Sequence, residues 1–276
     1  MTISVQTNVS ALVALQNLNV TNRQLQDAQN VISTGLKINN AKDNASVWAI
    51  AQGQRADVSS LAAVQASLNR ASSISDVAMT AGQSVSDLLN EVKAKVVASQ
   101  DPSLDTNSRN AINTDFQALL RQISDTINNA QFDGANILNG SLPNGIQFLA
   151  NADATSFITL SGQDFSLGGA IITMPSTASL NTVTNAAIVL TQISHSIANV
   201  NAALGDIGSQ AKQIDAHNMF ISKLSDVLNS GISNLVDADM AKESAQLQAL
   251  QVRQQLGVQA LSIANAAPQI VLSLFK

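Results

Sequence analysis

The side chains that most often perform catalysis or bind metals are few in this sequence and widely separated. His195 and His217 are the only histidines, and they show neither the i, i+4 spacing nor the neighbouring glutamate of a helical zinc site. Ser209 and Lys212 form the S-x-x-K pattern of certain acyl-transfer enzymes, but such a pair is expected by chance in a serine-rich helix. We therefore interpret these residues as polar positions on a helix.

Two carboxylates, Asp237 and Asp239, are the remaining candidates for a metal site. They lack the other ligands of a calcium-binding loop, and we predict instead that Asp239 caps a helix. The chain has no cysteine, which excludes disulfides, thiol nucleophiles and thiolate metal sites. The sequence therefore predicts a protein that is not an enzyme and that uses no metal or cofactor.

Composition and charge restrict the partners of the chain. Hydrophobic residues make up 45% of the sequence but aromatic residues only 3%, which suits helix seams better than a substrate pocket. The net charge is −5, and no lysine or arginine lies between Arg121 and Lys212, which argues against nucleic-acid binding. We expect no membrane insertion, because no apolar run approaches the roughly 20 residues that span a bilayer. Residues 1–22 do not resemble a Sec-type signal peptide.

The strongest pattern is an apolar seam with alternating spacings of four and three residues. A 3.5-residue period sustained over this length is typical of a coiled coil, because an ordinary amphipathic helix repeats every 3.6 residues. Asn218 and Ser225 interrupt the apolar side chains, and Gly205 and Gly208 favour a bend or an interruption of the helix. The seam positions are Ala186, Leu190, Ile193, Ile197, Val200, Leu204, Ile207, Ala211, Ile214, Asn218, Ile221, Ser225, Leu228, Ile232 and Leu235.

A second seam with the same spacing occurs upstream, and a third amphipathic helix follows it. Pro102 ends the second seam, because proline cannot continue a helix, and Asp105 or Thr106 is expected to cap the third helix. Each stripe needs a partner for burial, which predicts three long helices packed as an antiparallel bundle. The second seam contains Leu61, Val64, Leu68, Ala71, Ser75, Ala78, Gly82, Val85, Leu89, Val92 and Val96; the third helix carries Ile112, Phe116, Leu119, Ile123, Ile127 and Ala130.

Both ends of the sequence carry helical apolar stripes that the bundle does not obviously cover. Apolar helical ends without a partner favour burial against other copies of the chain. The N-terminal stripe contains Val5, Val9, Leu12, Leu15, Leu18, Leu25, Ala28 and Ile32, and the C-terminal stripe contains Leu247, Leu250, Leu256, Leu261, Ile263, Leu272, Leu274 and Phe275.

Residues 131–178 have a different pattern and predict a small β-element. Asp133-Gly134 and Asn139-Gly140 are dipeptides typical of hairpin turns. Short β-like runs follow at residues 146–149, 157–160 and 169–174. The predicted fold class is therefore mainly α: an elongated helical bundle or coiled-coil rod with a small β-element at one end and paired terminal helices.

Several stretches of the sequence resemble bacterial flagellins. Residues 34–45, TGLKINNAKDNA, are similar to the family signature S/T-G-x-R/K-I-N-x-A-x-D-D/N-A, and VDADMAKE at 236–243 resembles its DAD-x-A-x-E element. QFDG at 131–134 resembles the start of the family's β-element, and the run from QQLG at 254 to VLSL at 271 resembles its closing segment. Because these matches occur in order along the whole chain, it is identified as similar to the short alphaproteobacterial flagellins, which lack a large variable outer domain.

The resemblance implies a structural subunit that polymerises into the flagellar filament for swimming motility. It implies secretion through the flagellar type III apparatus into the extracellular filament. The implied domains are a terminal filament core (1–42 with 236–276), a helical bundle or rod (43–130 with 179–235) and its small β-element (131–178). The implied partners are other copies of the chain in a helical homopolymer, sister flagellins, an export chaperone, the filament cap protein and hook-associated junction proteins.

The resemblance also assigns roles to individual residues. It implies that the apolar residues of the two terminal stripes, apart from Ala28, form the polymerisation contacts. The signature turn consists of Gly35, Leu36, Lys37, Ile38, Asn39 and Asp43.

A third set of residues concerns recognition by animal hosts. Flagellins that activate the animal cell-surface flagellin receptor share a run Q-R-V-R-E-L, and the aligned residues 90–95 here read NEVKAK. Glu91 replaces the arginine that the receptor grips, and Lys95 replaces an apolar anchor. We therefore predict that the region of Asn90, Glu91 and Lys95 does not bind the receptor.

Two other functions remain open at this point. A hook–filament junction protein of the same family shares the terminal helices, although its similarity would fade away from the ends. A rod-shaped surface adhesin or glycan-binding protein would need a recognition face within residues 131–178.

Overall fold

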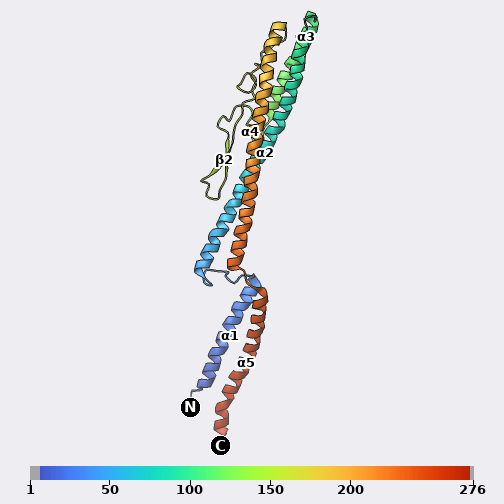
Figure 1. Cartoon of the computed structure of the whole chain (residues 1–276). Helices are drawn as coiled ribbons and strands as arrows, with labels where there is room; N and C mark the ends of the chain where they lie inside the picture. The colour runs from blue at the N-terminus through green and yellow to red at the C-terminus, as the bar shows by residue number, and fades with distance from the viewer. Residues whose placement is uncertain (1–6, 274–276) are drawn as a thin grey trace. The chain divides into compact units, whose positions relative to one another are not determined.

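A computed structural model describes the backbone of residues 7–273 and the side chains of residues 7–266. The elements are α1 (Val9–Thr34), α2 (Ala45–Ser99), α3 (Thr106–Asn129), β1 (Ile146–Leu149), β2 (Phe157–Leu160), α4 (Val183–Val236) and α5 (Met240–Ser273) (Figure 1). The described residues are thus mainly helical, with long packed helices and a two-stranded sheet, which confirms the predicted fold class. α4 runs for 54 residues, so Gly205 and Gly208 do not interrupt it.

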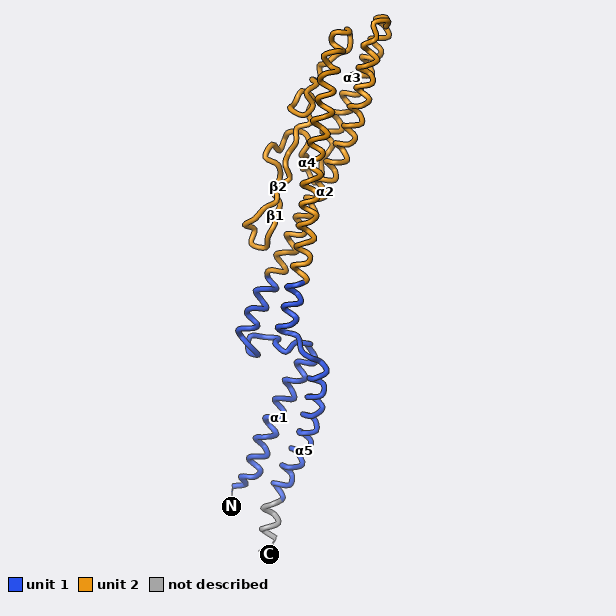
Figure 2. Tube along the Cα trace, in the orientation of Figure 1, with its two compact units in different colours: residues 1–56, 227–276 blue, residues 57–226 orange. Residues whose placement is uncertain are grey.

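The chain divides into two compact units (Figure 2). Unit 1 contains residues 1–56 and 227–276, and unit 2 contains residues 57–226. The long helices α2 and α4 each contribute residues to both units. The functional division into three domains that the resemblance implies stays a prediction.

The core of unit 2 forms where the apolar stripes of α2, α3 and α4 meet. Every predicted seam position of α2 is buried, and every predicted seam position of α4 is buried or half-buried. On α3, Phe116 and Ile123 are completely enclosed. At the polar break in the seam, Asn218 Nδ2 on α4 donates a hydrogen bond to Asn69 Oδ1 on α2 (2.7 Å). The predicted seam positions of α2 and α4 are therefore confirmed, but the pattern missed buried residues beside them, among them Ile74 and Leu88 on α2 and Leu120 on α3.

Small residues in the α2 seam let α4 approach closely. Ala71 and Ala78 are fully buried, and a Cβ atom added at Gly82 would lie only 2.5 Å from Leu204 Cδ2 on α4. A larger residue at position 82 would have to displace the Leu204 side chain, because interiors are packed to the density of organic crystals. The glycine thus leaves room for the Leu204 side chain between the two helices.

Side chains close the turn between α2 and α3. Asp105 is the N-cap of α3, as predicted, and its carboxylate accepts a hydrogen bond from the Ser108 backbone N–H (2.7 Å). The buried Arg109 guanidinium donates to the carbonyls of Ser99 and Asp101, the latter at 3.0 Å. These carbonyls lie at the end of α2, where the helix provides no further partners. Arg109 therefore gives the carbonyl of the buried Ser99 a hydrogen-bond partner, whereas the Asp101 carbonyl also accepts from the Leu104 N–H (3.4 Å).

The β-element begins with the tight turn that the sequence predicted. Asp133 and Gly134 both have positive φ values, 49° and 76°. Phe132 and Ala135 exchange two backbone hydrogen bonds across them, of 3.0 and 2.9 Å. Left-handed geometry at both central residues is what a type I′ turn requires, so this dipeptide prediction is confirmed.

Two of the three predicted strands form. β1 and β2 pair antiparallel, with Ile146 opposite Leu160 and Leu149 opposite Phe157. The bundle satisfies backbone groups beside this pair: Ser67 Oγ on α2 accepts from the Leu149 N–H (3.2 Å). The sheet therefore lies against the helices.

The third predicted strand, residues 169–174, does not form, and that prediction was wrong. Ile172 and Met174 are fully buried, as apolar strand residues would be. However, the Thr173 N–H donates to Ser196 Oγ on α4 (3.1 Å) instead of to a neighbouring strand. The segment buries its apolar side chains without a β-ladder, because side chains of α4 supply the hydrogen bonds that a ladder would have provided.

The α2–α3 turn makes one corner of the fold sensitive to acid. A backbone hydrogen bond from Ser103 is the main cause that lowers the pKa of Asp101 from its ordinary value of 3.8, and the hydrogen bonds from Ser108 lower the pKa of Asp105 in the same way. A lowered folded-state pKa contributes stability above pH 3.8, and this contribution is lost as the pH falls through the lowered value.

We therefore expect the melting temperature to drop in this acid range and Asp105→Asn to reduce the drop. Asparagine keeps the cap acceptor but carries no titratable charge. Thermal unfolding followed by circular dichroism, from neutral pH down to about pH 2, measures the melting temperatures of the unmodified protein and of Asp105→Asn across the titration of the Asp105 carboxyl group. Equal acid sensitivity in both proteins would contradict the role given to Asp105.

Candidate assembly site

The signature turn (residues 35–43) begins with the residue that ends α1. Gly35 adopts the left-handed conformation with φ of 73°, and its N–H donates to the Val31 carbonyl (2.8 Å), which closes the last helical turn. Side chains with a Cβ atom disfavour this region of backbone space, whereas glycine enters it freely. Gly35 therefore acts as the C-terminal cap of α1 and redirects the chain.

Backbone hydrogen bonds join the signature turn to the segment between α4 and α5. The Lys37 N–H donates to the Val236 carbonyl (2.8 Å), and the Ala238 N–H donates to the Gly35 carbonyl (2.9 Å). These bonds belong to an isolated antiparallel bridge, and the Lys37 ammonium adds a hydrogen bond to the Asn234 carbonyl (3.2 Å). Residues 34–45 and 236–243, which resemble the family signatures, are thus joined to each other by direct hydrogen bonds.

In the second half of the turn, side chains accept hydrogen bonds from the backbone N–H groups that precede and begin α2. Asp43 Oδ2 accepts hydrogen bonds from the backbone N–H groups of Asn39 (2.9 Å) and Asn40 (3.1 Å). The next residue, Asn44, accepts from the Val47 N–H (3.1 Å) in the manner of an N-cap. Three polar side chains of this segment therefore have a structural explanation, because Asn40, Asp43 and Asn44 each accept a hydrogen bond from a backbone N–H.

A polar cavity of about 440 Å³ lies between the signature turn and α1, with Asp27 and Asp43 in its wall. The Thr34 hydroxyl, also in the wall, donates to the Asn30 carbonyl (2.9 Å), so both Thr34 and Asp43 already serve the backbone. Ile38 is half-buried, and its N–H contacts the Val236 carbonyl (3.3 Å). The polar groups around this cavity hold the signature turn against neighbouring backbone. The residues that line the cavity do not include a nucleophile paired with a base, as a catalytic site would require.

In unit 1, α1 and α5 lie side by side (Figures 1 and 2). Their buried contact is small: Leu25 and Ala28 from α1 meet Leu250 from α5, and Leu247 packs against them. A fully buried core residue in a typical domain touches many apolar neighbours, and this cluster offers few. The pair therefore buries only a narrow strip of its surface.

Polar side chains help to fix the register of α1 and α5. Gln254 Nε2 on α5 donates to Asn22 Oδ1 on α1 (2.8 Å). Near the start of α1, Asn8 Nδ2 donates to the Ala264 carbonyl (2.6 Å). Side-chain hydrogen bonds of this kind contribute about 1 kcal/mol each at most when they are partly exposed, so they orient the helices more than they stabilise them.

Many of the apolar residues assigned to polymerisation remain exposed, and Leu12 and Leu15 border an open cavity with Leu261 of α5. Leu12 on α1 is 62% exposed and Ile263 on α5 is 73% exposed. Of the assigned residues, Val9, Leu12, Leu15, Leu256 and Ile263 are exposed, Leu18, Ile32, Leu247 and Leu261 are half-buried, and Leu25 and Leu250 are buried. Val5, Leu274 and Phe275, together with the side chain of Leu272, lie outside the described residues.

The structure adds exposed apolar residues that the sequence stripes missed. Val13 and Val20 on α1 and Val252 and Val258 on α5 are exposed as well. These four residues do not belong to the terminal apolar stripes that the helical period predicts. Helices that are apolar on more than one face are found buried in larger assemblies, and counting apolar residues on every face would have identified these positions.

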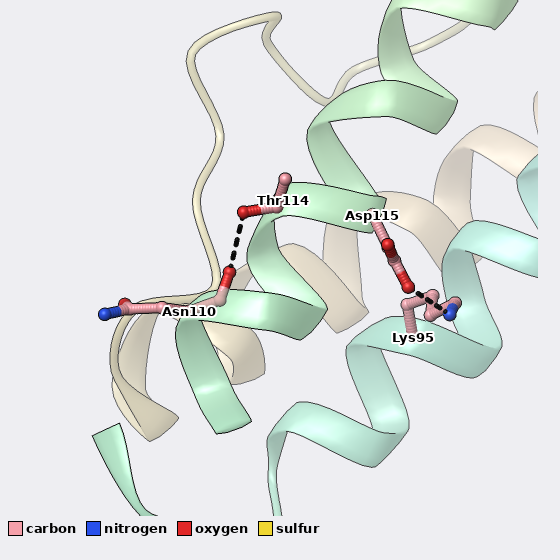
Figure 3. A network of polar contacts seen from close by, with 4 residues as sticks. All are labelled: Lys95, Asn110, Thr114 and Asp115. Carbon is pink, nitrogen blue, oxygen red and sulfur yellow. Dashed lines mark hydrogen bonds and ion pairs between the residues drawn. The ribbon is translucent and has the colours of Figure 1, made fainter. Parts of the chain in front are cut away.

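Residues 90–95 lie on α2 of unit 2. Asn90 and Glu91 are exposed. Lys95 is not a free surface cation, because its Nζ atom lies 2.7 Å from Asp115 Oδ2 on α3 (Figure 3). Any partner that engages this part of α2 would therefore meet the Glu91 carboxylate and an ion pair.

The residues considered for catalysis or metal binding have separate structural surroundings. His195 is exposed, and His217 Nε2 contacts the Ala150 carbonyl (2.7 Å) beside β1. Asp239 accepts a hydrogen bond from the Ala241 N–H (3.0 Å), which confirms it as the cap of α5. Across the described part of the chain, there is no cluster of three or more His, Cys, Asp or Glu side chains suited to a metal, and no helix long and apolar enough to cross a membrane.

Comparisons with known proteins give matches at both ends of the chain and over its full length. Residues 5–142 match the bacterial flagellin N-terminal helical region, and residues 190–275 match the bacterial flagellin C-terminal helical region. Flagellin FljJ of Caulobacter vibrioides is 52% identical over 100% of this chain and 99% of its own length. A flagellin of Brucella melitensis is 37% identical over 99% of both chains. The structure of a flagellar hook-associated protein from Vibrio parahaemolyticus, 14% identical, has a TM-score of 0.59 over 71% of this chain and 100% of its own, which shows a shared fold alone.

The cap at Gly35 gives a direct test of the signature turn. No atom lies within 4 Å of the position that a Cβ would take at Gly35, so a substitution meets no steric obstacle and only the backbone conformation is penalised. We expect Gly35→Ala to destabilise the protein by about 1–2 kcal/mol, because alanine disfavours left-handed geometry. Gly35→Asn is the matched control and should cost less, since asparagine enters this region more readily. Urea unfolding followed by circular dichroism measures both, and an alanine variant as stable as the unmodified protein would contradict this role.

Proposed function

Because the chain belongs to the bacterial flagellin family and is thus a structural, non-enzymatic subunit of the extracellular flagellar filament that drives motility, we propose that α1 and α5 together form its polymerisation surface. Full-length similarity to filament proteins decides against the junction-protein and adhesin alternatives. What remains to be assigned is which residues join one subunit to the next.

The distribution of apolar side chains in unit 1 supports this proposal. The α1–α5 pair encloses only a small cluster around Leu25 and Leu250, while Leu12, Leu256 and Ile263 are more than half exposed. Exposed apolar area of this kind is costly in water and typically marks an interaction surface. A contact between different surfaces of identical subunits does not close on itself, and it therefore produces a helical polymer.

The signature turn has a proposed role in transmitting this assembly to the rest of the chain. Its hydrogen bonds from Lys37 to Val236 and from Ala238 to Gly35 link the chain after α1 to the end of α4 and the segment that precedes α5. We assign to Gly35, Leu36, Lys37, Ile38, Asn39 and Asp43 the task of holding the two helices at a fixed spacing.

The finer partners are part of the same proposal. Sister flagellins, the filament cap protein and hook-associated junction proteins would contact the terminal helices, since these carry the exposed apolar residues. An export chaperone would cover α5 before secretion by the type III route, where Val252, Leu256 and Ile263 otherwise expose apolar surface to water.

Charge insertion tests the polymerisation surface. Leu12→Glu and Leu256→Glu place a carboxylate on exposed positions, so the fold of the subunit should be unchanged while burial of the charge at the interface opposes assembly. Gln16→Glu and Gln255→Glu are matched controls at neighbouring exposed positions that are already polar.

Seeded growth followed by electron microscopy and light scattering should show filaments for the two glutamine variants and a loss of elongation for the two leucine variants. Circular dichroism verifies that all four proteins retain their helices. Filament growth of the leucine variants at the unmodified rate would remove these residues from the interface.

We also propose that the surface around Asn90, Glu91 and Lys95 is a poor ligand for the animal flagellin receptor. Glu91 is exposed where receptor-activating flagellins carry arginine, and Lys95 is held by Asp115 where they carry an apolar residue. Reversing a charge in a desolvated contact places like charges opposite each other, at a cost on the order of several kcal/mol.

A receptor-reporter assay tests this property. The unmodified protein should signal weakly, and Glu91→Arg combined with Lys95→Leu should recover part of the signal. Because Lys95→Leu also removes the ion pair with Asp115, Asp115→Asn is the control for that loss alone and should not increase signalling. Strong signalling by the unmodified protein would refute the proposal.

A further inference from the structure

The β-element contains the same dipeptide twice within seven residues, Asn139-Gly140 and Asn144-Gly145. Asparagine followed by glycine is the pair most prone to cyclise, because glycine leaves the backbone nitrogen unobstructed. We propose that Asn139 is a site of spontaneous deamidation in the folded protein, whereas Asn144 is protected by its surroundings. The two sites share one sequence context, so any difference between them is produced by the structure.

The amide of Asn139 is polarised by two hydrogen-bond donors. Its Oδ1 atom accepts from the Ser141 backbone N–H (3.1 Å) and from the Ser141 hydroxyl (2.6 Å). The hydroxyl lies much farther from its other acceptor, the Asn136 carbonyl (3.4 Å). Negative charge develops on Oδ1 when a nucleophile adds to Cγ, and donors already aimed at that oxygen stabilise the developing charge.

The nucleophile at this site is also available. The antiparallel bridge between Asn139 and Asp164 turns the Gly140 N–H toward the Gln163 carbonyl, but no close hydrogen bond joins these two groups among the described residues. The space beside Gly140 is bordered by a side chain, since a Cβ built there would lie 3.0 Å from the Asp164 carboxylate. The Ser166 N–H (3.0 Å) and hydroxyl hold this carboxylate, so the space beside Gly140 widens only when a hydrogen-bonded side chain, and not the backbone, shifts.

The second dipeptide lacks these features. The Gly145 N–H donates to the Leu142 carbonyl (2.9 Å), and the Asn144 side chain makes no hydrogen bond among the described residues. A Cβ at Gly145 would lie 2.2 Å from the Leu160 carbonyl oxygen and 2.9 Å from Ser161 Cα. The glycine is therefore enclosed by backbone atoms, which cannot yield without disturbing the sheet.

The reaction needs only water. The Gly140 nitrogen bonds to Cγ of Asn139, the bond from Cγ to the side-chain nitrogen breaks, and ammonia leaves with the proton that the Gly140 nitrogen gave up. Water then opens the resulting succinimide ring. Cleavage between Cγ and the ring nitrogen gives aspartate, and cleavage at the main-chain carbonyl gives isoaspartate, in which the chain runs through the side chain.

Either product would alter the β-element locally. Asn139 lies opposite Asp164 in an antiparallel bridge, so a new carboxylate at 139 would face an existing one and repel it. Isoaspartate would also lengthen the backbone beside the buried Leu138, whose carbonyl accepts from the Phe165 N–H (2.8 Å). Deamidation would thus loosen this part of the subunit with age.

Peptide mapping can follow the two sites separately in the full-length protein. Trypsin is unsuitable, because it has no site between Arg121 and Lys212, whereas chymotrypsin can cut after Leu138 and after Phe148 and release both asparagines in one short peptide. Fragmentation of that peptide then shows which of the two asparagines has been converted. The folded protein is incubated at neutral pH and physiological temperature beside a sample unfolded in urea. Mass spectrometry then measures conversion of amide to acid, and isoaspartyl methyltransferase labelling detects isoaspartate.

We expect Asn139 to react several-fold faster than Asn144 in the folded protein, and both to react at similar rates in urea. Ser141→Ala removes one donor and should slow Asn139 several-fold without changing Asn144 or the melting temperature; Asn139→Gln should abolish the product at this site. Equal or faster reaction of Asn144 in the folded protein overturns the proposal, as does a folded protein in which neither site reacts. An unchanged rate at Asn139 in Ser141→Ala also overturns it.

Discussion

The packing of the α2 seam against α4 determines where the other parts of unit 2 can lie. Each long helix presents an apolar stripe that it cannot bury alone, and burial of each large apolar side chain contributes roughly 1.5–3 kcal/mol. Gly82 and the seam alanines bring the helices close enough for Leu204 to fill the space between them. Once these stripes meet, the remaining faces of the helices are free to hold α3 and the β-element.

The irregular segments of unit 2 follow from a second requirement, that buried backbone groups find hydrogen-bond partners. Arg109 supplies partners at the end of α2, and Ser196 supplies one to the buried run at 169–174. Gln210 on α4 does the same for the Ser161 N–H beside β2 (2.7 Å). The bundle thus acts as the hydrogen-bonding surface that a larger sheet would otherwise have provided, and a two-stranded sheet is sufficient.

Unit 1 shows the opposite balance. The ends of its helices are capped, since Gly35 ends α1, and Asn44 and Asp239 accept hydrogen bonds at the starts of α2 and α5. Its apolar surface, by contrast, is largely left open, with a buried cluster of only a few side chains between α1 and α5. A subunit of a filament needs this combination: local geometry that is determined within the chain, and apolar area that is covered only by neighbouring subunits.

The sequence by itself determined the features that depend on short-range physics. The 3.5-residue period located every buried seam position of α2, and side-chain type identified the caps Asp105 and Asp239 and the turn at Asp133-Gly134. These follow from helix geometry and from hydrogen bonds to residues two or three positions away. Tertiary structure alone decided the rest. The run at 169–174 reads as a strand, but Ser196 on α4 offers its backbone a different partner. Asn139 and Asn144 have the same following residue, yet the backbone of Leu160 encloses one glycine and the Asp164 side chain borders the other. In both cases the deciding atoms come from distant parts of the chain, which no local pattern contains.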